Sequence, residues 1–279
     1  MSELAERLGF PDGARCVLVT ADEFGLCHAA TEGVLEALRA GAAPSAGLLV
    51  PAPWAREAAA HASGRDVGVH LSLTASLPRY RWGPVTFAPS LLGGDGGFPT
   101  TVEDLHDHAD PDEVRRECRA QLERAVLLGV DPTHLSVQDG ALFAEPALFD
   151  VVVELAEEAR LPLRLPDRGL GFGFPLHALA SGRGIVAPDA VLDARACELA
   201  DTAALDAAIG PGVTELVLRP ALDTDELRAL APDADARVAD LDSLLAYGGL
   251  RAALERAGVT VLAWASLRDV VRTRSTAAR

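Results

Sequence analysis

The stretch ARCVLVTADEFGL, residues 14–26, indicates the fold class. Its first half is a run of mostly β-branched and apolar residues, and it ends in two adjacent acids, Asp22 and Glu23, followed by Phe24 and Gly25. Such a run, closed by a glycine, is typical of a short strand that is buried on both faces, as in a parallel sheet. Because an unpaired buried carboxylate is costly, the two acids must be paired or must line a cleft. The stretch therefore predicts an α/β protein with a functional acidic pair at a strand end.

Strands and helices alternate along the rest of the chain. Further strands are predicted at SAGLLVPA (45–52), VGVHLSLT (67–74), THLSVQ (133–138), PLRLP (162–166), TELVLRPA (214–221) and VTVLAWAS (259–266). Amphipathic helices are predicted over 29–40, 54–61, 111–128 and 146–160. This is the βαβ pattern of a parallel sheet with both faces covered, as in a barrel or a doubly wound sheet. We expect a single-domain (β/α) barrel-like fold with about seven mostly parallel strands.

Two segments interrupt the alternation. Residues 76–110 are too long for an ordinary connection, and residues 167–188 are rich in glycine and phenylalanine. Long insertions after barrel strands usually form the active-site mouth, which is where we expect both. With no internal repeat and no linker-like segment, residues 1–279 are predicted to form one domain.

Composition restricts the class of partner. The formal net charge of −16 opposes binding to nucleic acids and to anionic membranes, so we expect a small-molecule substrate and a monomer or homodimer. There is no apolar run of membrane-spanning length, the first ten residues lack the pattern of a signal peptide, and the four cysteines are widely spaced. These features predict a cytoplasmic protein, and the arginine- and alanine-rich composition is typical of a bacterial one.

Polar residues at the predicted strand ends form the candidate site, because barrel enzymes place their active sites at the carboxyl ends of the strands. The candidates are Asp22 and Glu23 after the first strand, His70 and Thr74 on the third, Ser136, Gln138 and Asp139 on and after the fourth, Arg164 on the fifth, and Arg219 on a late strand. Gln138 and Asp139 can both reach the mouth only if the strand has already ended, since adjacent strand residues point to opposite faces. Tyr80 and Trp82, in the first insertion, are candidates for stacking on a sugar or another ring.

Four segments that contain these residues resemble the YdjC-type family, which includes the chitooligosaccharide deacetylases. TADEFGLCHAATEG resembles the family's ADDFG motif, DVGVHLSLTA its GxHxxLT strand, PTHLSVQDGAL its PTHxDSH segment and GVTELVLRPA its GVTE…HP segment. They occur in the family's order. The resemblance implies a barrel-like fold in which the second acid of ADDFG and two histidines bind a divalent metal. The first acid would act as base on a metal-bound water that attacks an acetamide.

Four of the six matched positions differ in this chain. Asp22 matches the base and His70 matches one metal histidine. Glu23 stands at the metal-binding aspartate, Gln138 at the second histidine, Ser136 at the aspartate of DSH and Arg219 at the histidine of HP. A longer carboxylate displaces its oxygen, an amide is a poor zinc ligand, and a permanent cation opposes metal binding.

The leading functional hypothesis is therefore a deacetylase fold repurposed as a metal-independent acid/base enzyme, of isomerase, lyase or cyclase type, that acts on a small metabolite in bacterial biosynthesis. Asp22, Glu23, His70, Asp139 and Arg219 are its predicted catalytic residues, and Gln138, Ser136, Thr74, Tyr80, Trp82 and Arg164 its predicted substrate-binding residues, with no cofactor. One alternative is a metal-dependent deacetylase of acetylated amino sugars, with zinc or another divalent metal held by Glu23, His70 and Asp139. A second alternative is an inactive binding protein.

Overall fold

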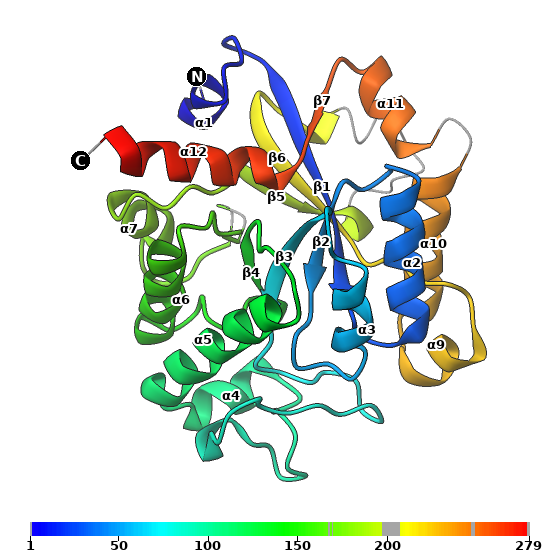
Figure 1. Ribbon diagram of the computed structural model, residues 1–279, viewed down its shortest axis with the longest axis vertical. Helices are drawn as coiled ribbons and strands as arrows, with labels where there is room; N and C mark the ends of the chain where they lie inside the picture. Colours follow the sequence, from blue (N-terminus) through cyan, green and yellow to red (C-terminus); the bar gives the residue numbers. More distant parts are fainter. Residues whose placement is uncertain (1, 167, 169, 197–206, 247–248, 278–279) are drawn as a thin grey trace.

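The computed structural model describes residues 2–166, 168, 170–196, 207–246 and 249–277 (Figure 1). At its centre the described residues form one parallel sheet of seven strands, in the order β4-β3-β2-β1-β6-β5, with β7 paired to β1. The strands are β1 (Arg15–Phe24), β2 (Ser45–Leu48), β3 (Asp66–Leu71), β4 (Leu135–Val137), β5 (Ala190–Asp193), β6 (Gly212–Leu218) and β7 (Thr260–Leu262). This curled sheet confirms the predicted α/β barrel-like fold.

Helices cover the sheet on its outside (Figure 1). They are α1 (Glu3–Arg7), α2 (His28–Arg39), α3 (Ala55–Ala60), α4 (Val102–His108), α5 (Pro111–Leu127), α6 (Pro146–Ala159), α7 (Leu176–Gly182), α9 (Asp225–Leu230), α10 (Ala234–Leu245), α11 (Leu250–Arg256) and α12 (Trp264–Ala277). Three 3-10 turns are η1 (Pro89–Leu91), η2 (Gln138–Gly140) and η3 (Ala194–Ala196). The four helices predicted from the sequence are present, each within about a residue of its expected start. None of the helices in the described ranges is both long and apolar enough to cross a membrane.

Two predicted strands need correction. PLRLP contributes only an isolated bridge between Leu135 and Leu163, because Pro162 and Pro166 enclose it and proline cannot donate to a sheet ladder. The fifth strand is instead Ala190–Asp193, which pairs with β6. The predicted strand at 259–266 ends at Leu262, since α12 begins at Trp264.

The strand next to β1 leaves room for the side chain of Asp22. β1 lies at the middle of the sheet, and nearly all of its residues are buried. Beside it on β2, Gly47 leaves space for the carboxylate of Asp22: a Cβ at Gly47 would lie 2.5 Å from Asp22 Oδ1. The glycine therefore lets a charged side chain lie flat over the neighbouring strand.

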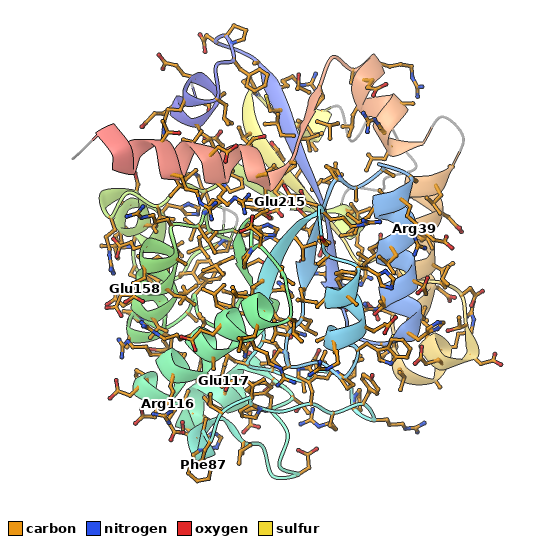
Figure 2. All side chains as sticks on the ribbon, in the orientation of Figure 1. Arg39, Phe87, Arg116, Glu117, Glu158 and Glu215 are labelled. Carbon is orange, nitrogen blue, oxygen red and sulfur yellow. The ribbon has the colours of Figure 1, made fainter. Side chains whose placement is uncertain are left out.

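A buried carboxylate is one of the groups that hold the first insertion to α5. Glu117 is fully buried, and its oxygens accept hydrogen bonds from the amides of Val85 and Thr86 and from the Thr86 hydroxyl, at 3.0, 2.9 and 2.6 Å. Figure 2 shows Glu117 on α5 where the helix faces this insertion. Within the insertion, the indole of Trp82 is buried and donates to the hydroxyl of Ser72 at 3.0 Å.

Candidate active site

A cavity of about 740 Å³ opens at the carboxyl ends of the strands. Seven of the residues singled out at the strand ends line it together, namely Asp22, Glu23, His70, Gln138, Asp139, Arg164 and Arg219. Both insertions contribute to its wall, the first through Val102 and Glu103 and the second through Leu170 and Phe172. Residues of both insertions therefore line the same cavity.

Asp22 is held by a buried guanidinium. Arg164 donates to both of its carboxylate oxygens, at 2.5 and 3.2 Å, and to both oxygens of Glu215, at 2.5 and 2.7 Å. Figure 2 shows Glu215 at the centre of the molecule. Burial alone would raise the pKa of Asp22, but Arg164, together with His70 and Arg219, lowers it to about 2. Asp22 is therefore a fixed anion at neutral pH.

Glu23 is held by arginines as well. It follows Asp22 in a left-handed conformation, with φ of 63°, which turns its side chain away from the strand. One carboxylate oxygen accepts a short hydrogen bond from Arg237 on α10, and the other lies 3.5 Å from Nε of Arg219. Arg219 in turn donates to Asp193 at 2.9 Å. Two guanidinium groups thus neutralise the Glu23 charge.

His70 lies between Asp22 and Ser136. Its Nδ1 is 2.8 Å from the Ser136 hydroxyl, and its Nε2 is 4.0 Å from Asp22 Oδ2. Burial lowers the pKa of His70, an effect that Arg164 reinforces and Asp22 opposes, so the ring is neutral at neutral pH. In the tautomer whose Nδ1–H donates to the serine, Nε2 carries a lone pair that faces Asp22.

β4 ends early enough for two adjacent residues, Gln138 and Asp139, to reach the cavity, as the sequence predicted. The strand stops at Val137, and η2 follows with Asp139 at φ of 53°, so that Gln138 and Asp139 both reach the cavity. Asp139 accepts a hydrogen bond from the Thr74 hydroxyl at 2.9 Å.

The family resemblance implies a metal at this place, and the residues present do not fit one. Among the described residues no group of three or more histidine, cysteine, aspartate or glutamate side chains is placed to hold a metal ion. Both Glu23 oxygens face arginines, Asp139 is bound to Thr74, and an amide occupies position 138. The alternative set Glu23, His70 and Asp139 is therefore not assembled as ligands.

Four of the predicted substrate-binding residues do not line the cavity. Ser136 and Thr74 are fully buried behind it, where they bind His70 and Asp139. Trp82 belongs to the hydrophobic core and Tyr80 packs against it, because the insertion needs its own core. Arg164 does line the cavity, but its donors are directed at Asp22 and Glu215 rather than at a ligand.

Sequence reasoning missed three charged partners: Glu215, Asp193 and Arg237. Glu215 interrupts the apolar run of β6, and a buried acid in such a run is a signal that could have been used. Arg237 comes from a helix 214 residues after Glu23, and no sequence pattern connects the two.

The chain is similar to known proteins over most of its length. Residues 16–255 match the family described as YdjC-like protein. The carbohydrate deacetylase of Thermus thermophilus is 38% identical over 173 residues, which are 62% of this chain and 61% of that protein. The carbohydrate deacetylase of Brevibacillus brevis is 37% identical over 153 residues, 54% of this chain and 59% of that protein. The chain therefore spans about three fifths of the length of these curated relatives.

A solved structure has the same fold. A protein of Enterococcus faecalis assigned to cellobiose-phosphate cleavage superposes with a TM-score of 0.80 and 23% sequence identity, covering 91% of this chain and 99% of that chain. At this level of identity the likeness shows the fold alone.

These relatives overturn the leading functional prediction. The hypothesis of a non-hydrolytic isomerase, lyase or cyclase is wrong, because the relatives at 37–38% identity are carbohydrate deacetylases, which are hydrolases. With its match over residues 16–255, the chain belongs to the YdjC-like protein family.

Proposed function

We propose that this chain is a hydrolase that removes acetyl groups from an acetylated carbohydrate in the cavity at the strand ends. The observation that carries the proposal is the pair formed by the Asp22 carboxylate and the neutral His70 imidazole, 4.0 Å apart at the cavity wall. The deacetylase relatives support the substrate class, and the size of the cavity, about 740 Å³, suits a sugar unit with its neighbour.

The two groups are suited to hold one water molecule. Two acceptors cannot hydrogen-bond to each other, and at a separation of 4.0 Å both can accept from one water molecule between them. The neutral His70 is the better proton acceptor of the two, because the pKa of Asp22 is held at about 2. Asp22 then orients the water and stabilises the imidazolium that forms.

The remaining charges have complementary roles. As the water attacks the acetyl carbonyl, negative charge develops on its oxygen, and the Arg219 guanidinium at the cavity wall is the cation placed to stabilise it. Burial alone would lower the pKa of Arg219, but Glu23 and Asp193 raise it above its usual value, so Arg219 supplies charge and not a proton. His70 returns its proton to the leaving nitrogen or oxygen of the sugar.

Acetate release tests the proposal. The purified protein is incubated with N-acetylglucosamine oligomers, with and without added zinc and with a chelator, and acetate is measured. We expect release by the wild-type protein, and a loss of about a hundredfold or more in His70→Ala and Asp22→Asn. Leu127→Ala, at an exposed position on α5, is the control that keeps the wild-type rate. No acetate from any acetylated sugar under any of the three conditions would contradict the proposal.

A binding protein without turnover is a second candidate, favoured by one observation. Arg164, Arg219 and Arg237 already neutralise Asp22 and Glu23, so the charged centre is complete without a reaction. Binding of the same oligomers with no acetate release would support this candidate instead.

A further inference from the structure

A buried acid behind the cavity binds the arginine that holds Asp22. Glu215 is fully buried and does not belong to the lining of the cavity. Its Oε1 accepts hydrogen bonds from Thr20 Oγ1 at 2.7 Å, from Trp264 Nε1 at 3.2 Å and from Arg164 Nη2 at 2.5 Å. Its Oε2 accepts a hydrogen bond from Arg164 Nε at 2.7 Å. Because Glu215 does not reach the cavity, these contacts serve the protein and not a ligand.

Arg164 uses two edges of its guanidinium group for two carboxylates. The edge formed by Nε and Nη2 binds Glu215, and the edge formed by Nη1 and Nη2 binds Asp22 at 2.5 and 3.2 Å. The guanidinium group is planar and rigid, so the position of one carboxylate fixes the direction from which the other is bound. Glu215 therefore determines where Arg164 places its donors on Asp22.

The backbone holds the two ends of this bridge differently. Arg164 lies outside the named strands, in a segment that pairs with β4 through an isolated bridge at Leu163. Glu215 lies in the middle of β6, opposite Leu18 of β1 and Val191 of β5, so strands on both sides hold its backbone. A long arginine side chain on such a segment has many rotamers, and a partner on a central strand selects one of them. The acid on β6 is thus the anchor of the bridge.

The summed charge of the three groups acts on His70. Asp22 and Glu215 carry two negative charges and share the one positive charge of Arg164, so a net negative charge is buried beside His70. Arg164 neutralises Asp22 only in part, because it also binds Glu215. In the proposed mechanism His70 takes a proton from water and becomes an imidazolium, which the remaining negative charge stabilises. Without the charge of Glu215, the ion pair of Asp22 and Arg164 would be neutral as a whole.

We propose that Glu215 is a positioning residue, which holds Arg164 on Asp22 and keeps part of the Asp22 charge available to His70. This inference rests on the proposed function and deepens it, because it assigns a role in the reaction to a residue that the substrate does not touch. Loss of this role lowers the rate of the chemical step and leaves binding of the sugar unchanged.

The variant Glu215→Gln tests the role in the intact chain. The amide keeps the size of the side chain and an oxygen for Thr20 and Trp264, but it loses the charge and meets an Arg164 donor with its own N–H. We expect kcat for acetate release from N-acetylglucosamine oligomers to fall by about tenfold or more, with KM and the dissociation constant of the oligomer changed by less than about twofold. The Arg164 Nε–H signal in proton–nitrogen NMR, identified by its absence from Arg164→Lys, is expected to move or to disappear through faster exchange.

A carboxylate elsewhere in the sheet provides the control. Asp66 begins β3, at the end of the strand away from His70, and accepts a hydrogen bond from Thr133 at 2.6 Å. Asp66→Asn also exchanges a carboxylate for an amide, and it is expected to change neither kcat nor the Arg164 signal. Thermal unfolding compares the stabilities of the variants.

A second variant carries the test if Glu215→Gln does not fold. Glu215→Asp keeps the charge and moves the carboxylate back by one methylene, away from Arg164. We expect a loss of kcat of at least about threefold with unchanged KM.

A kcat that stays at the wild-type value, or a loss that appears in KM instead, would overturn the positioning role of Glu215. So would an equal loss of kcat in Asp66→Asn, because the loss would then follow from lower stability. An unchanged Arg164 signal in Glu215→Gln overturns the role whether or not acetate is released, because the signal is measured without a substrate. A wild-type protein that releases no acetate from any acetylated sugar would overturn the proposed function, and the part of Glu215 in it.

Discussion

At the scale of single residues, the candidate site contains two backbone conformations that non-glycine residues rarely adopt. Glu23 and Asp139 have φ values of 63° and 53°, and each follows the end of a buried strand or lies at it. Such conformations cost about 1–3 kcal/mol each and persist where the surrounding contacts fix them. Here the contacts are Arg237 for Glu23 and Thr74 for Asp139, which hold both carboxylates at the cavity.

The residues that sequence could identify are those whose position follows from a strand end. Asp22 and His70 interrupt or end apolar runs, so the pattern alone brings them to one mouth. Arg237 could not be found in this way, because it reaches Glu23 through helix packing far along the chain. Trp82 was predicted at the site from its loop position, and only the folded insertion reveals that its ring fills the core.

A second buried histidine, His134, makes stability depend on pH. Its ring is stacked on Trp264 with centroids 4.4 Å apart, and its Nε2 is buried without a partner. Burial, with a smaller contribution from Arg164, lowers the pKa of His134 well below its usual value. In the unfolded chain the ring takes up a proton below about pH 6.5, and in the folded protein it does so only at lower pH. Unfolding therefore binds a proton in this range, and acid lowers the free energy of unfolding.

We expect His134→Asn to have a shallower dependence of stability on pH. Each such histidine contributes a slope of up to about 1.4 kcal/mol per pH unit, and the variant lacks one of them. Urea unfolding at pH 7, 6 and 5 measures the slope in both proteins. His70, whose pKa is also lowered, contributes with the same sign, while Asp66 and Asp240, whose pKa values are raised, contribute with the opposite one. These groups are common to both proteins, so identical slopes would contradict the assignment to His134.

At the scale of elements, apolar periodicity located the long helices and the central strands well. It failed where a short element has little apolar content of its own. β5 is only four half-buried residues, Ala190–Asp193, and its pairing with β6 rather than its composition makes it a strand. PLRLP has the apolar content of a strand, but its two prolines prevent a full ladder.

Because Glu117 attaches the first insertion to α5, its substitution is expected to loosen the insertion. Glu117→Ala leaves the amides of Val85 and Thr86 without their acceptor, and we expect a loss of about 2–4 kcal/mol in the free energy of unfolding. Limited proteolysis near Val85 and Thr86 should become faster, because this part of the insertion loses its attachment to the helix, while Ser90 and Phe87 stay bound to Glu113 and Arg116. Glu123→Ala, at an exposed position of the same helix, is the control. Equal cleavage rates in the two variants would show that the insertion is held by other contacts.

At the scale of the whole molecule, the charge of the site is balanced by groups from distant parts of the fold. Arg164 follows β4 in the chain, Arg219 follows β6 and Arg237 lies on α10, and all three converge on two acids at the end of β1. We therefore expect the purified protein to contain well under one equivalent of zinc.

A set of substitutions tests whether Arg237 prevents zinc from binding at position 23. Glu23→Asp, Gln138→His and Arg219→His together restore the residue types of the family's metal site, but Arg237 still neutralises position 23. Adding Arg237→Met is expected to raise zinc affinity by at least about tenfold over the triple variant. Isothermal titration of wild type, triple and quadruple variants decides this. Equal affinities in the last two would show that Arg237 does not control the site.

The pair formed by Glu23 and Arg237 also has a consequence for related sequences. Both side chains are buried, and a single substitution of either one leaves the other with only its second partner, Arg219 at 3.5 Å for Glu23 and Asp233 at 2.8 Å for Arg237, which is expected to be destabilising. A change of this centre into a metal-binding one would have to remove Arg237 as well, because its guanidinium occupies a Glu23 oxygen that a metal would need. Relatives that carry a glutamate at position 23 are accordingly expected to carry an arginine at position 237, and sequences that lack one of the two are expected to lack the other.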